Sequence, residues 1–476
     1  MSATDLVAIL PMLVLTMAAV AATVLAAFRT SHAFNAALAV SAFALALFSL
    51  VPASNAAPRA VTALISVDAY SLLFTGLLLG AAIAVTLFSY GYNEGREGGL
   101  AEFYIVLLIA TLGAIVLAVS AHVATFFLGL EILGVSLYVL IASDLGERAN
   151  EASIKYLILA GIASSFLVFG MALVYTELGT MEFSEMARRT GESGAGPLLL
   201  AGLAMITVAA GFKLAAAPFH MWAPDVYEGA PAPVGAFLAA VSKGAVAALL
   251  LRFFLQTGSL ALHPLFIVFG AVAVASMFTG NILALFQTSI KRTLAYSSIA
   301  HVGYLLIAFL AGGRAGMVAA GYYLAAYFVS IIGAFGAVTL LSGKDRELDL
   351  LDDYRGLAWQ RPWLAGAFAA MLLSLAGMPL TAGFLGKFFV AAAGVREALW
   401  FFVIAFAINS AIAVYYYLRI ITVLFSPSYG EAPGPLPRLP LAGTVALGAL
   451  TLLLVFLGVY PGPLLALLEE AASAFL

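Results

Sequence analysis

The stretch from Phe212 to Pro231 (FKLAAAPFHMWAPDVYEGAP) places Lys213, Pro218 and His220 inside an otherwise apolar run. An ionised side chain in the hydrocarbon of a bilayer costs about 2.5–3.5 kcal/mol on insertion scales. A proline also removes a helical hydrogen bond and leaves backbone carbonyls that another group must satisfy. Because these costly residues lie close together in one spanning helix, we predict that the helix is broken there and that the break takes part in the transport of an ion or a proton.

Other ionisable residues lie inside apolar runs, and each has a structural and a functional interpretation. Glu131 either makes a hydrogen bond between helices or pairs with a lysine. Lys155 lies near the start of its run, so it either extends to the interface or joins a relay. His220 either binds the carbonyls freed by the break or carries protons. His301 is flanked by hydroxyls and belongs either to a polar helix seam or to a proton relay.

Lys213, Lys243 and Lys387 lie too deep in their runs to reach the interface easily, and Lys387 follows a second interruption, as a counterpart of Lys213. Lysine suits proton transfer because burial lowers its pKa and a nearby carboxylate raises it again. The absence of a second acidic residue deep in an apolar run argues against a sodium site. Backbone carbonyls at the breaks keep that alternative open.

The composition predicts an all-α polytopic membrane protein. Hydrophobic residues make up 64% of the 476 residues and charged residues 9%, against about 25% charged in a soluble domain. The chain has no cysteine, which excludes disulfides, thiolate zinc sites and cysteine-ligated iron–sulfur clusters. It has no basic tail or patch, which argues against nucleic acid as a partner.

Hydropathy predicts about 14 transmembrane helices. We interpret the first apolar run, 5–28, as a retained span, and the segment after Pro461 as an amphipathic surface helix. The seventh span, 197–228, and the twelfth, 360–393, are too long for one crossing and contain prolines, which predicts that helices 7 and 12 are broken.

The two breaks lie five spans apart, which predicts two five-helix repeats, helices 4–8 and 9–13. An odd number of helices per repeat inverts the second copy, as in many transporters. The predicted parts of the chain are the N-terminal helices (1–100), the first repeat (101–256), the second, inverted repeat (257–425) and the last helix with the C-terminal amphipathic segment (426–476).

Lysine and arginine are more frequent in the odd-numbered loops, which predicts that the N-terminus faces the periplasm. In this interpretation Lys291 and Arg292 are orientation charges at the start of a span, and Arg252 is a charge of an even-numbered loop.

Two stretches carry a resemblance to a known family: Phe212–Pro231, and Lys291–Tyr304 (KRTLAYSSIAHVGY). Both resemble the antiporter-like membrane subunits of respiratory complex I, the NADH:quinone oxidoreductase, and the likeness extends over spans 4–13. Within this family, Asp225–Pro231 and Lys387 are similar to the bacterial N type.

The resemblance implies roles for the matching residues. Glu131 would be the partner carboxylate on helix 5, and Lys213 on helix 7 the central switching lysine. Lys243 on helix 8 would relay protons toward the second half, and Lys387 on helix 12 would lie at the exit. The supporting relay positions would be Lys155, His220 and His301.

The resemblance also implies a function: a non-redox, proton-translocating subunit that couples NADH oxidation by quinone to proton pumping in the bacterial inner membrane. No cofactor is expected in this chain, since the flavin, the iron–sulfur clusters and quinone belong to partner subunits. The expected partners are the other membrane subunits and the lipid bilayer.

Three alternatives remain open from the sequence. The first is a subunit of a cation/proton antiporter or of a membrane hydrogenase-type complex. The second is a solute permease, which should place selective polar groups at the breaks; near Pro379 only Thr381 offers a polar side chain. The third is a structural scaffold, which would not need buried lysines.

Overall fold

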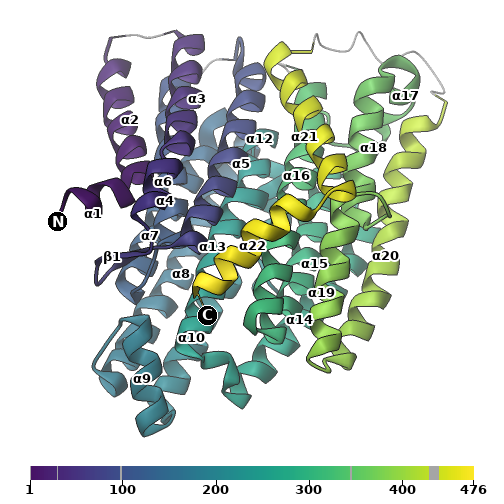
Figure 1. Ribbon diagram of the computed structural model, residues 1–476. Coiled ribbons are helices and arrows are strands. Elements are labelled where there is room, and N and C mark those ends of the chain that lie inside the picture. The colour runs from purple at the N-terminus through teal and green to yellow at the C-terminus, as the bar shows by residue number, and fades with distance from the viewer. Residues whose placement is uncertain (1, 29–30, 97–98, 344–345, 428–438, 476) are drawn as a thin grey trace.

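The computed structural model describes residues 2–28, 31–96, 99–343, 346–427 and 439–475, and they form a predominantly helical bundle (Figure 1). Within these residues, 12 helices are long and apolar enough to cross a membrane. The shorter apolar helices Leu10–Ala26 and Pro362–Ala376 fall in the first and twelfth predicted spans. The all-α membrane fold is therefore confirmed, while the number of 14 crossings and the inverted repeat stay predictions.

The first half of the chain contains α1 (Ala3–Ala8), α2 (Leu10–Ala26), α3 (His32–Phe48), α4 (Leu50–Ala56), the antiparallel hairpin β1 (Arg59–Thr62) and β2 (Ile65–Val67), α5 (Ala69–Asn93), α6 (Leu100–Ala118), α7 (Val123–Ile141), the 3₁₀ turn η1 (Ala142–Asp144), α8 (Glu147–Leu178), α9 (Phe183–Ser193), α10 (Pro197–Leu214), α11 (Trp222–Gly229), α12 (Ala232–Phe237), the π-helical η2 (Leu238–Ser242) and α13 (Lys243–Thr257).

The second half contains the 3₁₀ turn η3 (Ser259–Ala261), α14 (His263–Leu285), α15 (Ile290–Ala311), α16 (Gly313–Leu341), the 3₁₀ turn η4 (Leu351–Tyr354), α17 (Leu357–Gln360), α18 (Pro362–Ala376), α19 (Ala382–Arg396), α20 (Trp400–Phe425), α21 (Leu441–Val459) and α22 (Gly462–Phe475).

The helices form an elongated bundle, with α2 and α3 at one end and α18 and α20 at the other (Figure 1). The segments α12–α13 and α16 are buried inside it, whereas α8 and α21 expose much of their apolar surface. The helix α22 runs obliquely across the bundle and contacts α5 and α16.

Small residues allow the helices to approach closely, as is usual in membranes. Between α14 and α15, a Cβ atom at Gly280 would lie 2.5 Å from the backbone nitrogen of Ala300. A Cβ atom at Gly303 would lie 2.6 Å from the carbonyl oxygen of Ala273. These glycines therefore bring α15, which carries His301, against α14.

Both predicted helix breaks are confirmed. The helix α10 ends at Leu214 and is followed by Ala215 in the left-handed region (φ 56°). This end agrees with Pro218, whose ring would clash with the carbonyl of the preceding turn if the helix continued.

The second break separates α18 from α19. Gly377, with φ 85°, terminates α18, because glycine adopts this conformation without strain. Thr381 begins α19 as its N-cap, and its hydroxyl accepts a hydrogen bond from the backbone nitrogen of Phe384. The one polar side chain noted near Pro379 in the sequence thus has a structural role.

Several elements were not predicted from the sequence, and three features among them bear on the site. The hairpin β1–β2 and the short helix α9 lie in segments expected to be loops. The third is η2, a π-helical segment that interrupts the predicted eighth span directly before Lys243. π-helical turns inside α-helices often occur at functional sites.

The interpretation of Arg252 as a loop charge is wrong. Because α13 continues to Thr257, Arg252 lies more than a turn inside the helix, where its side chain is 0% exposed. It donates a hydrogen bond of 2.6 Å to Oδ1 of Asp68, the N-cap residue of α5. This buried ion pair fixes α5 against α13.

We expect Asp68→Asn to destabilise the protein by about 3 kcal/mol, because a buried ion pair that loses one charge leaves the other uncompensated. The substitution keeps an oxygen that can accept the capping bond from Ser71. The measurement is thermal unfolding of the purified protein in mild detergent.

Asp5→Asn is the matched control, since it removes the charge from the more exposed Asp5–Arg59 pair and should cost less than about 1 kcal/mol. Equal effects of the two substitutions would contradict a structural role for the buried pair.

Candidate functional site

Lys213 lies in the last turn of α10, immediately before the first break, and is 5% exposed. Its amine lies 3.4 Å from the hydroxyl oxygen of Tyr156 on α8 and 5.4 Å from the centre of the tyrosine ring. The neighbouring Trp222 donates a 2.9 Å hydrogen bond from Nε1 to the carbonyl of Phe212. The break therefore positions Lys213 and supplies a donor for one of the freed carbonyls.

Glu131 is partly buried on α7 and accepts a hydrogen bond from Oγ of Ser164 on α8. Among the described residues, neither Glu131 nor Lys213 forms an ion pair within 4.0 Å. Lys213 instead faces α7 one turn further along, where a Cβ atom on Gly134 would lie 2.7 Å from its Nζ. The expected partners therefore form no ion pair in this structure, although the amine of Lys213 reaches α7 one turn from Glu131.

The π-helical segment η2 ends at Ser242, and Lys243 follows it as the first residue of α13. Lys243 is 4% exposed and donates a 2.6 Å hydrogen bond to Oγ of Ser298 on α15. The same oxygen accepts a 2.7 Å bond from the hydroxyl of Tyr327 on α16. Ser298 thus connects Lys243 to a tyrosine on a third helix.

His301 lies one turn after Ser298 on the same helix and is surrounded by tyrosines. Its Nδ1 is 2.5 Å from the hydroxyl of Tyr323, and its Nε2 is 3.3 Å from that of Tyr417. Its ring centre is 5.0 Å from that of Tyr327. Both ring nitrogens therefore have hydroxyl partners on different helices.

Lys387 is buried on α19 and turns back toward the second break. Its amine donates to the carbonyl of Ala376, the last residue of α18, at 2.8 Å and to Oγ of Ser410 at 3.0 Å. It also lies 5.2 Å from the ring centre of Tyr304, whose ring is 5.6 Å from that of His301. Polar and aromatic groups thus extend from Lys243 to Lys387.

Lys155 and His220 are the two remaining predicted site residues. Lys155 has 43% of its side chain exposed and pairs with Glu151 at 2.8 Å and Asp225 at 3.0 Å. His220 is buried inside the first break, and its Nδ1 has no hydrogen-bond partner among the described residues. The structure places Lys155 in a surface ion pair and His220 beside the interrupted backbone.

A charged cluster that the sequence interpretation did not identify joins α11 to α15. Arg292 donates from Nη1 to Asp225 at 2.9 Å and to Glu228 at 2.7 Å. Because Asp225 also binds Lys155, this carboxylate connects three helices. In the sequence, the signal for a basic partner was the spacing of Asp225 and Glu228, because acids three residues apart lie on one face of a helix.

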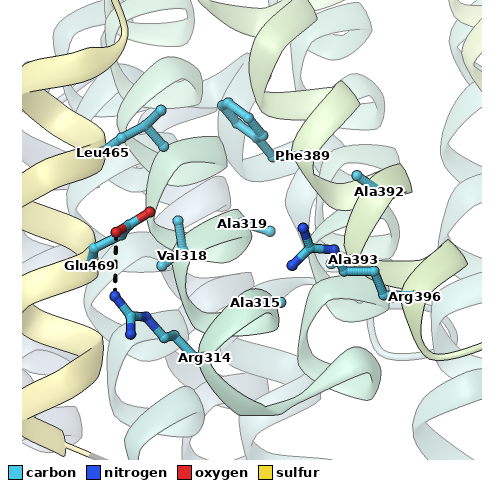
Figure 2. Close-up of a pocket in the computed structure, with 10 residues that line it drawn as sticks. All are labelled: Arg314, Ala315, Val318, Ala319, Phe389, Ala392, Ala393, Arg396, Leu465 and Glu469. Atoms are coloured by element: carbon cyan, nitrogen blue, oxygen red, sulfur yellow. Dashed lines mark hydrogen bonds and ion pairs between the residues drawn. The ribbon is translucent and has the colours of Figure 1, made fainter.

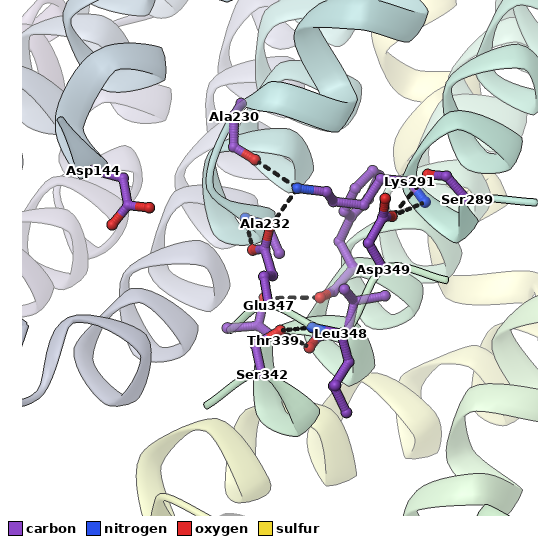
Figure 3. A network of polar contacts seen from close by, with 12 residues as sticks. Asp144, Ala230, Ala232, Ser289, Lys291, Thr339, Ser342, Glu347, Leu348 and Asp349 are labelled. Carbon is purple, nitrogen blue, oxygen red and sulfur yellow. Dashed lines mark hydrogen bonds and ion pairs between the residues drawn. The ribbon is translucent and has the colours of Figure 1, made fainter. Parts of the chain in front are cut away.

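The interpretation of Lys291 as an orientation charge is wrong, because Lys291 is buried at 2% exposure. Its amine pairs with Glu347 and donates to the carbonyl of Ala230 at 3.0 Å, while Glu347 accepts from the nitrogen of Ala232 at 2.7 Å (Figure 3). The segment 346–350 folds over the start of α15 and encloses this pair. The network holds the junction of α11 and α12.

Asp349 belongs to the same network and lies outside the spanning helices. It accepts hydrogen bonds from Oγ of Ser289 at 2.8 Å and from the backbone nitrogen of Lys291 at 3.1 Å (Figure 3). Burial raises the pKa of its carboxyl group above the usual range, and the charge of Lys291 acts against that rise.

Among the described residues, no three His, Asp or Glu side chains gather closely enough to hold a metal ion. The groups that do gather are ammonium, imidazole and hydroxyl groups at helix interruptions. The fold and this arrangement define a polytopic membrane protein built like those that translocate ions or protons.

The chain belongs to the NADH:quinone oxidoreductase/Mrp antiporter transmembrane family, whose model matches residues 120–413. This segment contains all the predicted site residues. The chain is 48% identical over 473 residues to NADH-quinone oxidoreductase subunit N of Methylococcus capsulatus, with 98% of this chain and 95% of the relative covered. The family resemblance predicted from the sequence is confirmed.

Solved structures agree with this assignment. A chain of respiratory complex I from Thermus thermophilus with bound aureothin matches with a TM-score of 0.83 and 34% identity, covering 97% of this chain and 99% of that one. A chain of the Mrp complex from Dietzia sp. DQ12-45-1b matches with a TM-score of 0.87 at 20% identity, covering 99% and 97%. The second likeness concerns the fold alone.

The contact between Gly134 and Lys213 predicts a specific effect of Gly134→Ala. The new methyl group would displace the lysine amine, which is the flexible end of a side chain, so the fold should tolerate it. Alanine is also better than glycine in a helix by about 1 kcal/mol. We therefore expect unchanged or higher thermal stability together with a several-fold loss of NADH-driven proton pumping.

Gly161→Ala on α8 is the matched control, because a Cβ atom at this position meets nothing within 4 Å. Both variants are measured for thermal unfolding and for acidification of inverted membrane vesicles. Equal pumping by the two variants would contradict the positioning role of Gly134.

Proposed function

We propose that this chain is a proton-translocating subunit, itself without a redox group, of an NADH:quinone oxidoreductase. The observation that carries the proposal is a series of buried groups between Lys243 and Lys387. Hydrogen bonds join Lys243, Ser298 and Tyr327, and ring and cation–π contacts continue the series through His301 and Tyr304 to Lys387. The named relative, subunit N, supports the same assignment.

The series has the chemistry that proton transfer needs. A hydroxyl both donates and accepts, so Ser298 and Tyr327 can pass a proton without carrying a net charge. The imidazole of His301 can accept at one nitrogen and donate at the other, and each nitrogen has a tyrosine hydroxyl within reach. In this proposal these groups carry protons between the lysines, so that no free ion crosses the hydrocarbon.

The first half supplies the proposed switch. Ser164 holds Glu131, and Tyr156 holds Lys213, so carboxylate and amine have separate partners. A shift of the amine along α7 from Gly134 toward Glu131 would form the ion pair, which retains the proton on the lysine. Opening the pair releases that proton toward the relay.

The redox chemistry belongs to partner subunits in this proposal. NADH oxidation and quinone reduction would take place on flavin, iron–sulfur clusters and quinone bound by other chains. This chain would sit among other membrane subunits of the complex in the bacterial inner membrane, with its N-terminus in the periplasm.

The proposal predicts that Lys213→Ala and Glu131→Ala each reduce NADH-driven proton pumping about tenfold or more, since each removes a positioned proton-transfer group. Pumping is measured as acidification of inverted vesicles, and the amount of inserted protein by immunoblotting. Arg188→Gln on the surface helix α9 is the control, because its charge pairs only with exposed or half-exposed glutamates.

Full pumping by both inserted variants would overturn the proposal. Sodium–proton exchange by the purified complex in the absence of NADH would overturn it in favour of a cation/proton antiporter. Co-purification of NADH:quinone reductase activity with the chain is the result that the proposal requires.

A further inference from the structure

A cavity of about 410 Å³ lies between α16, α19 and α22, away from the lysine series (Figure 2). Its polar lining consists of Arg314 at the start of α16, Arg396 at the end of α19 and Glu469 on α22. The rest of the lining is apolar and is formed mainly by alanines with Val318, Phe389 and Leu465.

The cavity lies at the ends of spanning helices. Arg314 is the second residue of α16, and Arg396 is the last residue of α19. Lys387, which is buried, precedes Arg396 by nine residues on α19, or about 13 Å at 1.5 Å per residue. The guanidinium groups are thus at the level where spanning helices leave the hydrocarbon, which is where lipid headgroups lie.

The charges of the cavity do not balance. Glu469 pairs with Arg314 at 3.3 Å, whereas Arg396 has no ion-pair partner among the described residues and extends across the cavity toward α16 (Figure 2). Two guanidinium groups face one carboxylate, so the cavity keeps one uncompensated positive charge. The first turn of α16 adds the positive end of a helix dipole.

The positive charge and the apolar lining together indicate which class of ligand fits the cavity. A guanidinium binds phosphate oxygens in a bidentate geometry, so the two arginines suit the phosphate of an anionic lipid headgroup. The apolar side chains Val318, Phe389 and Leu465 can contact the acyl chains. A free anion would make no use of this apolar surface.

We propose that this cavity binds the headgroup of an anionic phospholipid, with Arg396 as the primary phosphate ligand and Arg314 as the second. The bound lipid would join α22 to the end of the helix that carries Lys387. Glu469 then competes with the phosphate for Arg314.

The test uses the purified complex in mild detergent and a photoactivatable phosphatidylglycerol, with crosslinked peptides mapped by mass spectrometry. We expect crosslinks in the segments that line the cavity on α16 and α19. Their yield should fall on the order of tenfold in the double variant R314Q/R396Q and should rise in Glu469→Gln, which removes the competing carboxylate.

Three controls define the result. Arg188→Gln should leave the yield unchanged, a phosphatidylcholine probe should crosslink weakly, and excess inorganic phosphate should not displace phosphatidylglycerol. Equal yields for wild type and the double variant, or for the two lipids, would overturn the proposal. Crosslinking that appears only after a neighbouring subunit is removed would also overturn it and assign the cavity to a protein interface.

Discussion

The structure depends on the free-energy cost of placing lysine amines inside a membrane. An intact apolar helix cannot offset this cost, because it offers the amines no hydrogen-bond acceptors. Each deep lysine lies at an irregular helix segment: Lys213 and Lys387 at the two breaks, and Lys243 directly after a π-helical turn. The irregular backbone provides carbonyl groups, as at Ala376, and space for polar side chains from neighbouring helices. Because backbone without regular hydrogen bonds is tolerated at membrane depth only inside protein, these segments must be surrounded by other helices.

The packing around Lys243 and His301 follows from this requirement. The segments α12–α13 and α16 are buried, so the amine of Lys243 and the ring of His301 are enclosed by helices rather than lipid. Aromatic hydroxyl groups supply the polar contacts, since a tyrosine presents an apolar ring and a polar end. The same helices thus provide both the apolar core and the hydrogen-bond partners of the proposed relay.

The sequence predicted those features that depend on single residue types. A proline or glycine in an apolar run marks a break, and a lysine deep in such a run predicts a buried amine. Both broken helices and the burial of Lys213, Lys243 and Lys387 could therefore be predicted. The π-helical turn η2 could not, because Leu238–Ser242 is apolar and contains neither marker. The burial of Lys291 depends on a segment more than fifty residues later that folds over it. Glu131 and Lys213 form no ion pair, because their separation depends on how α7 and α10 are placed relative to each other. Residue spacing in the sequence does not determine that placement.

The most direct test of the central claim is proton pumping by a variant in which Lys213, Lys243 and Lys387 are all replaced by leucine. The variant should still insert, because leucine is apolar, while the carbonyl of Ala376 and the hydroxyl of Ser298 each lose a hydrogen-bond donor. NADH-driven pumping is measured in vesicles together with thermal stability and NADH:quinone reductase activity. If the buried lysines carry protons, pumping by the variant falls to the level of vesicles without the complex. Full pumping by a correctly inserted variant would contradict the account and identify the lysines as structural.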